Sequence, residues 1–133
     1  MTSKITYLGD LRTVSVHLQS GTEILSDAPK DNHGKGEAFS PTDLLANALG
    51  SCMISIMAIK SKELDVELKG STIEVTKIMQ AEPRKIAKIE AVLQLAVSVD
   101  QKTRTILERA AMHCPVLLSL HPDIEKKITF NWK

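Results

Sequence analysis

Alternation of apolar and polar residues predicts strands at the start of the chain. Val14, Val16 and Leu18 share one parity, whereas the residues between them are polar, which is typical of a half-buried strand. Turn-forming residues separate this segment from shorter strand-like segments on either side. We therefore expect a three-strand meander over residues 5–8, 13–19 and 22–25, with turns at residues 9–10 and 20–21.

A polar loop follows the third expected strand. Residues 27–40 contain Pro29, Gly34 and Gly36 and have no apolar periodicity. Loops of this length in a small domain are often functional, although a crossover between layers would also need one. Gly34 and Gly36 flank Lys35 but lack the spacing of a phosphate-binding loop. We interpret them as a turn.

The most apolar helix of the chain is expected next. Ser40 can cap it, Pro41 suits the first helical position, and Asp43 completes a capping-box pattern. Apolar residues then recur every three or four positions and cover nearly every side, which predicts a central, buried helix. Gly50 inside a helix costs about 1 kcal/mol relative to Ala, so we expect another backbone to approach closely near Cys52. A single small sheet cannot cover such a helix, and we expect a second subunit to supply part of the cover.

Strand and helix patterns alternate in the second half of the chain. The apolar positions change phase at Gly70–Ser71, which indicates a bulge or kink. Asp100 can cap a second helix and Pro115 can open a short third one. The expected elements are strands over residues 66–75, 89–99 and 128–132, a helix that includes residues 106–111, and a helix over residues 115–120.

The order of these elements is βββ-α-ββ-αα-β. Runs of strands separated from helices indicate the α+β class, with antiparallel sheets around the central helix. A length of 133 residues without a linker or repeat predicts a single domain, residues 1–133.

Composition excludes several classes of protein. Apolar residues make up 43% and charged residues 25%, which is an ordinary globular mixture. The net charge is +1 and only 3% of residues are aromatic, so the basic face and stacking rings of a nucleic-acid binder are missing. The longest apolar run, residues 44–59, is shorter than the roughly 20 residues needed to cross a bilayer, and no signal peptide precedes the strands. We expect a cytoplasmic protein that contacts neither nucleic acid nor membrane.

The two cysteines are the candidate reactive groups. Cys52 and Cys114 form no CxxC pair and no zinc-binding pattern, which leaves two inert thiols, one reactive thiol or a redox pair. Cys114 precedes Pro115 at an expected helix start, and a helix dipole and the adjacent His113 would both lower its pKa unless His113 points away. Cys52 lies about three turns into its helix and resembles a core thiol. It would need a partner from elsewhere in the fold to react.

Two motifs resemble those of one known family. Ser40-Pro41-Thr42-Asp43-Leu44-Leu45, followed by Ala48-Leu49-Gly50-Ser51-Cys52, is similar to the central helix of the OsmC/Ohr family of thiol peroxidases. Ala111-Met112-His113-Cys114-Pro115-Val116 resembles the second cysteine motif of that family, and Gly34-Lys35-Gly36 fits the loop before the helix. The element order matches as well, so the resemblance extends over essentially the whole chain.

The resemblance implies an intertwined homodimer that reduces organic hydroperoxides. Cys52 would take one peroxide oxygen and become a sulfenic acid. Cys114 would condense with it to a disulfide, and an external dithiol, lipoyl-linked in well-studied members, would reduce the pair. No metal, haem or flavin is implied.

One departure from the family pattern concerns the acid that assists the thiolate. Family peroxidases have a glutamate directly after the proline that opens the central helix, where this chain has Thr42. That glutamate works with an arginine, for which Arg12 is the candidate here. The resemblance leaves Asp43 and Glu37 as the acids that could substitute.

Two other functions stay open from the sequence. A non-catalytic protein of the same fold could carry a small lipid-like or thiol ligand in an apolar pocket near Cys52. Other thiol chemistry, such as acyl transfer through Cys52, is a further alternative.

Overall fold

Two three-stranded sheets and three α-helices make up the protein in this computed structural model, which describes residues 1–133. The chain divides into two compact units, residues 1–45 and 46–133, and each is described by itself. The α+β class and the order of elements are confirmed, whereas the single domain stays a prediction. The elements are β1 (Ser3–Gly9), β2 (Arg12–His17), β3 (Glu23–Asp27), α1 (Pro41–Glu63), β4 (Thr72–Gln80), β5 (Lys85–Leu95), α2 (Gln101–Ala111), α3 (Pro115–Ser119) and β6 (Glu125–Trp132), with a single 3₁₀ turn at Lys30–Asn32.

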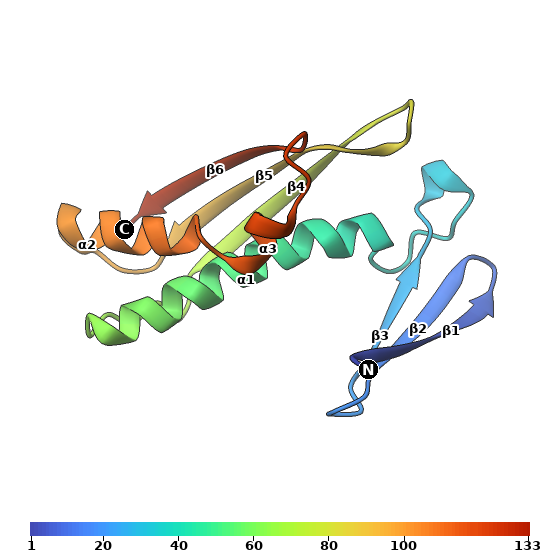
Figure 1. The fold of residues 1–133 in the computed structure, drawn as a ribbon, viewed down its shortest axis with the longest axis horizontal. Coiled ribbons are helices and arrows are strands. Elements are labelled where there is room, and N and C mark those ends of the chain that lie inside the picture. The colour runs from blue at the N-terminus through green and yellow to red at the C-terminus, as the bar shows by residue number, and fades with distance from the viewer. The chain divides into compact units, whose positions relative to one another are not determined.

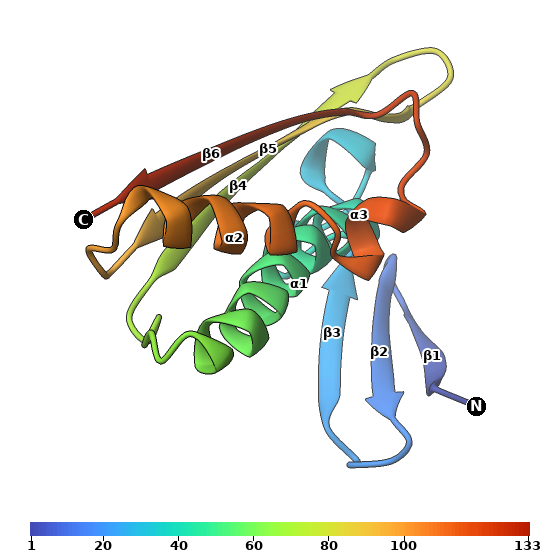
Figure 2. The same ribbon diagram turned by 60° about the vertical axis from the view of Figure 1, so that its left-hand side comes forward.

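The first unit contains the predicted meander, with β1, β2 and β3 paired antiparallel in that order (Figure 2). Apolar side chains point to both faces of this sheet, because successive residues of a strand alternate. Ile5, Tyr7 and Ile24 lie on one face and are at least half exposed, and Leu25 on the other face is 46% exposed. This sheet therefore lacks a buried core of its own within the chain.

The second unit packs α1 and α2 against one face of the sheet β4-β5-β6 (Figure 1). Alternate residues of β5 point to the helices, and α1 contributes side chains spaced three or four positions apart. The largest fully buried apolar side chains of this core are Leu49, Met53, Met57, Ile89, Leu93 and Leu107, together with Cys114. The second cysteine motif is thus part of the core.

The sheet of the second unit is mixed, which corrects the expectation of antiparallel sheets. β4 and β5 are antiparallel, but β5 and β6 run parallel. Both α2 and α3 lie in the connection from β5 to β6, and a crossover of this length lets a chain return in the same direction.

Two expected strand segments are wrong. Residues 66–68 lie outside any strand, since β4 begins at Thr72, and β5 begins at Lys85 and ends at Leu95 instead of reaching Val99. Val66 follows the end of α1, where its N–H donates to the carbonyl of Ser61 at 2.9 Å. Val66, Leu68 and Val97 nevertheless pack in or against the core. Their alternation therefore reflects burial without strand pairing.

The central helix α1 has 23 residues and buries one side within this chain. Leu45 and Ile59 are 42% and 62% exposed, and the expectation that a second subunit covers part of α1 stays a prediction. By length and composition α1 could cross a membrane, but the core helix of a soluble protein has the same properties. Leu49, Met53 and Met57 are completely buried in the core, as in such a helix.

Candidate active site

A reciprocal cap fixes the start of the helix that carries Cys52. The N–H of Ser40 donates to the carboxylate of Asp43 at 3.0 Å, and the N–H of Asp43 donates to the hydroxyl oxygen of Ser40 at 3.0 Å. Pro41 occupies the first helical position, as predicted. This capping box satisfies two backbone donors that would otherwise lack partners. The predicted site residue Asp43 thus holds the helix end.

Gly50 lets α1 lie close to β4. A Cβ atom at position 50 would stand 2.9 Å from Cγ2 of Val75 and 3.3 Å from Cγ2 of Ile73. The packing at Gly50 is therefore close, but the neighbours are side chains of a strand, so the expected approach of a backbone near Cys52 is wrong. Residues two apart on a helix do not share a face. Close packing at Gly50 thus leaves Cys52 on a different side of α1.

Cys114 is held at the junction of α2 and α3. It caps α3, and its sulfur accepts a hydrogen bond from the N–H of Leu117 at 3.4 Å. Its own N–H donates to the carbonyl of Ala111 at 3.2 Å, and its carbonyl accepts from Leu118 at 3.1 Å. The residue is 0% exposed. Backbone and side chain of Cys114 are therefore both anchored.

The two sulfurs lie close together although their motifs are far apart in the sequence. Both cysteines are unbonded thiols, and the side chain of Cys52 lies near enough to that of Cys114 to raise its pKa. Cys52 is half-buried on α1, whereas Cys114 is completely buried. Two adjacent thiols from separate elements are the arrangement that a reversible disulfide needs.

Burial controls the acidity of Cys114, which corrects an expectation from the sequence. Removal from water raises the pKa of the Cys114 thiol; the Leu117 N–H opposes this shift, and the adjacent Cys52 reinforces it. The expected lowering by His113 does not occur, because Nδ1 of His113 lies 2.7 Å from the carbonyl oxygen of Arg109 and this ring is exposed. The third helix has only five residues, too few to generate a large dipole.

Arg12 lies within the first unit, between two carboxylates. Its Nε and Nη2 atoms donate to the two carboxylate oxygens of Asp27 at 2.7 and 2.8 Å, and Nη2 also donates to Glu37 at 3.1 Å. The carboxylate of Asp27 further accepts the backbone N–H of Glu37 at 3.1 Å. The predicted residues Arg12 and Glu37 are thus in contact, and Asp43 forms the helix cap instead.

Asp27 is the residue of this cluster that the sequence did not single out. Its side chain is 1% exposed, and a buried carboxylate requires a partner of this kind. The hydrogen bonds from Arg12 hold the pKa of Asp27 below its usual value against the opposing effect of burial, and those to Asp27 and Glu37 raise the pKa of Arg12. Arg12 and Asp27 are cross-strand neighbours on β2 and β3. The predicted hairpin, with its turn at residues 20–21, would have paired Arg12 with residue 29, so the sequence did not indicate this contact.

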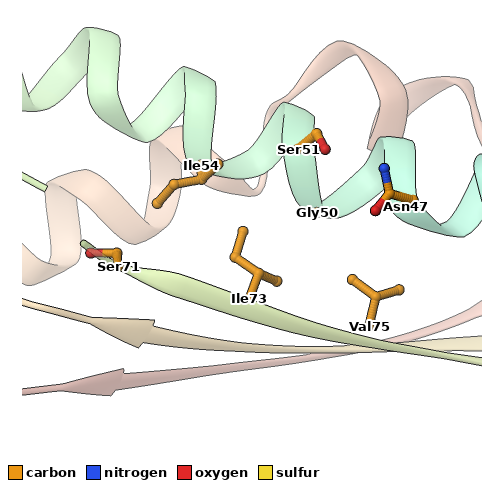
Figure 3. Close-up of a pocket in the computed structure, with 7 residues that line it drawn as sticks. All are labelled: Asn47, Gly50, Ser51, Ile54, Ser71, Ile73 and Val75. Atoms are coloured by element: carbon orange, nitrogen blue, oxygen red, sulfur yellow. The ribbon is translucent and has the colours of Figure 1, made fainter. Parts of the chain in front are cut away.

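A separate cavity of about 210 Å³ lies between α1 and β4 (Figure 3). Ligand pockets usually measure about 300–1,000 Å³. Neither cysteine lines this cavity, and no group of three His, Cys, Asp or Glu side chains is placed to hold a metal ion. Its walls are Asn47, Gly50, Ser51, Ile54, Ser71, Ile73 and Val75.

Solved structures resemble this fold over nearly the whole chain. A protein from Psychrobacter arcticus 273-4, named as a candidate osmotic stress induced and detoxification response protein, is 50% identical, with 98% of this chain and 96% of that chain covered and a TM-score of 0.95. An organic hydroperoxide resistance protein OsmC from Legionella pneumophila is 15% identical, with coverage of 98% and 97% and a TM-score of 0.76.

A third solved structure, the organic hydroperoxide resistance protein OhrB of Bacillus subtilis, is 18% identical over 98% of both chains, with a TM-score of 0.67. The similarities to the Legionella pneumophila and Bacillus subtilis structures establish the fold alone, because both identities are low. No curated protein sequence matches this chain. The model of the OsmC-like protein family matches residues 34–129, which include both cysteines and the second part of the loop before the central helix. The chain therefore belongs to the OsmC-like protein family.

Proposed function

We propose that this protein is a thiol-dependent peroxidase that reduces organic or hydrogen peroxides through Cys52 and Cys114. The observation that carries the proposal is the pair of adjacent, unbonded thiols, one half-buried and one in the core. The Cys52 thiolate attacks one peroxide oxygen, the O–O bond breaks, and an alcohol or water leaves. Cys52 becomes a sulfenic acid. The Cys114 thiolate then attacks the sulfur of Cys52, the hydroxyl group takes up a proton and leaves as water, and a disulfide forms.

A dithiol closes the proposed cycle. It reduces the disulfide to two thiols and is itself oxidised to a disulfide, so that two electrons pass from dithiol to peroxide in each turnover. The lipoyl-linked dithiols that serve family members are the proposed reductants. A cytoplasmic location fits this cycle, since reducing compartments return such pairs to thiols.

Substitution of each cysteine tests this assignment. Cys52→Ser is expected to abolish hydroperoxide consumption, because serine is not oxidised by peroxides. Cys114→Ser should consume about one equivalent and then stall as a sulfenic acid. Residual hydroperoxide and dimedone-labelled Cys52 are the quantities to measure, with Ser51→Ala on the same helix as the control. A Cys52→Ser variant that works at the normal rate would refute the proposal.

We propose that Arg12 is the cation that assists the Cys52 thiolate, and that Glu37 is the acidic partner of Arg12. Glu37 contacts Arg12 directly, whereas Asp43 is engaged in the helix cap. Arg12→Met is expected to lower kcat/KM for hydroperoxide by about 10²-fold, the order seen when one preorganised donor is lost. Steady-state kinetics with thermal unfolding of the same samples would check this.

A matched pair of variants separates chemistry from folding in that test. Glu37→Gln removes the charge from an exposed side chain and should change activity with little change in the unfolding temperature. Lys35→Gln in the same loop is the control. Full activity of folded Arg12→Met would remove Arg12 from the mechanism.

The cavity between α1 and β4 gives the binding-protein alternative no support. It is smaller than most ligand pockets, and Cys52 does not line it.

A further inference from the structure

The two thiols differ in their access to solvent, and this difference has consequences for the reductive half of the cycle. Cys114 is 0% exposed and belongs to the core cluster, whereas Cys52 only packs against that cluster and is half-buried. A thiol that attacks a disulfide approaches in line with the S–S bond, from the far side of the sulfur it attacks. Access therefore decides which of the two sulfurs is attacked.

Rotation of Cys114 toward solvent would disrupt the junction between α2 and α3. Three hydrogen bonds hold the residue: one to its sulfur from Leu117, one from its N–H to Ala111, and one to its carbonyl from Leu118. Pro115 follows directly, and its ring restricts the backbone conformation of the residue before it. The sulfur of Cys114 is thus kept inside the core by both neighbouring helices.

We propose that the external reductant attacks Cys52, so that the mixed disulfide forms on Cys52 and Cys114 leaves. The inference rests on the proposed function and names the position at which its reductant reacts. A reductant thiolate bonds to Sγ of Cys52, the Sγ–Sγ bond breaks, and Cys114 departs with the electron pair and takes a proton. The second thiol of the reductant then attacks its own first sulfur. That step releases the Cys52 thiolate and leaves the reductant as a disulfide.

The leaving-group ability of Cys114 opposes attack at Cys52, but it changes the exchange rate less than solvent access does. A leaving thiol of higher pKa departs more slowly, and burial raises the pKa of Cys114. Exchange rates follow thiol basicity with a slope of about 0.4–0.5 for the attacking thiol. A slope of that order for the leaving thiol changes the rate only about threefold per pKa unit. A sulfur with no exposed surface cannot be attacked until the core opens, so access outweighs the leaving-group effect.

The raised pKa of Cys114 also protects the mixed disulfide once it has formed. Only a thiolate attacks a disulfide, and the raised pKa keeps the released Cys114 protonated near neutral pH. Protonation slows the return of Cys114 onto Cys52, and a rapid acid quench stops it, so that the reductant can be trapped on Cys52.

Peptide mapping of a trapped mixed disulfide tests the proposal. The Cys52–Cys114 disulfide is made with diamide, treated briefly with glutathione at pH 7, quenched with acid, unfolded, and alkylated with N-ethylmaleimide. Trypsin places the two cysteines on separate peptides, residues 36–60 and 110–126. We expect glutathione on the Cys52 peptide and the maleimide on the Cys114 peptide, in about tenfold excess over the reverse pattern. Glutathione on Cys114, or equal amounts on both, would overturn the inference.

A second measurement keeps this test separate from that of the peroxidase activity. Reduced, folded protein exposed to a bulky maleimide should be labelled at Cys52 before Cys114, and the reverse order would also overturn the inference. Diamide forms the disulfide without peroxide. Failure of peroxide alone to oxidise the pair would refute the proposed function, whereas failure of diamide to link the two peptides would refute the inference.

Discussion

At the scale of single residues, the buried thiol of Cys114 limits how fast the proposed disulfide can form. Burial raises its pKa, and the N–H of Leu117 offsets this shift only in part. The resolving step needs the Cys114 thiolate. At neutral pH only a small fraction of Cys114 is therefore ready to attack the sulfenic acid on Cys52.

The raised pKa of Cys114 predicts that the attack of Cys114 on the sulfenic acid depends on pH. Below the raised pKa of Cys114, the thiolate fraction and hence the rate of disulfide formation should rise about tenfold per pH unit. Dimedone added with one equivalent of peroxide competes for the sulfenic acid, so the ratio of labelled to linked Cys52 peptide should fall steeply between about pH 6 and 9. The Cys114→Ser variant provides the matched control for the reaction of dimedone itself. A ratio that does not change with pH would contradict the prediction.

Sequence patterns singled out the two cysteines that we propose to be reactive, but not all the neighbours of the proposed site residues. Cys52 and Cys114 lie in distinctive motifs, and such motifs can be recognised from the sequence without a structure. Asp27 was missed because its partner, Arg12, is its neighbour only through the register of β2 and β3. The acidity of Cys114 was misjudged for a related reason, since burial depends on the whole core and is not encoded in the neighbouring residues His113 and Pro115.

At the scale of secondary-structure elements, Gly50 determines how closely α1 packs on β4. A glycine costs a helix about 1 kcal/mol relative to Ala. Here the space that a methyl group would need is taken by Val75 and Ile73. The β-branched side chain of Val75 has little freedom to move away.

Gly50→Ala is accordingly expected to destabilise the protein despite its better helix propensity. Overpacking costs about 1–3 kcal/mol, which exceeds the roughly 1 kcal/mol gained in the helix. We expect a net loss of about 1 kcal/mol in the free energy of unfolding, measured by urea denaturation. Ser55→Ala on the exposed side of α1 is the control for helix propensity. The loss should shrink by about 1 kcal/mol in a Val75→Ala background, and an unchanged loss there would exclude Val75 as its cause.

Most elements follow from local patterns, and the errors share one physical origin. The capping box of α1, the cap at Asp100 and the proline that opens α3 were all predicted, because these signals act within one turn. The parallel pairing of β5 and β6 depends on contacts between distant segments, which alternation does not specify. Alternation of apolar and polar residues indicates which residues are buried. Val97 therefore fitted the strand pattern, because it packs against the core, although it lies outside β5.

At the scale of the whole molecule, apolar surface remains uncovered on both units. The sheet β1-β2-β3 exposes Ile5, Tyr7 and Ile24 on one face, and α1 exposes Ile59. A small isolated sheet needs packing against a hydrophobic face to be stable in water. Contiguous exposed apolar patches on a soluble protein mark sites of association. We propose that a second copy of the chain covers these surfaces and leaves Cys52 open to peroxide and reductant.

A homodimer is therefore the last prediction, and light scattering coupled to size-exclusion chromatography measures it directly. The expected mass is twice the chain mass of 14.6 kDa at micromolar concentration. Ile24→Glu places a charge on the exposed apolar face of β3 and should shift the protein toward the monomer mass, since an unpaired charge is costly to bury in an interface. Thr76→Glu, on the polar outer face of β4, leaves the dimer intact as the matched control. A wild-type protein that elutes at 14.6 kDa would contradict the prediction and would require the exposed faces of α1 and β1-β2-β3 to be stable in water.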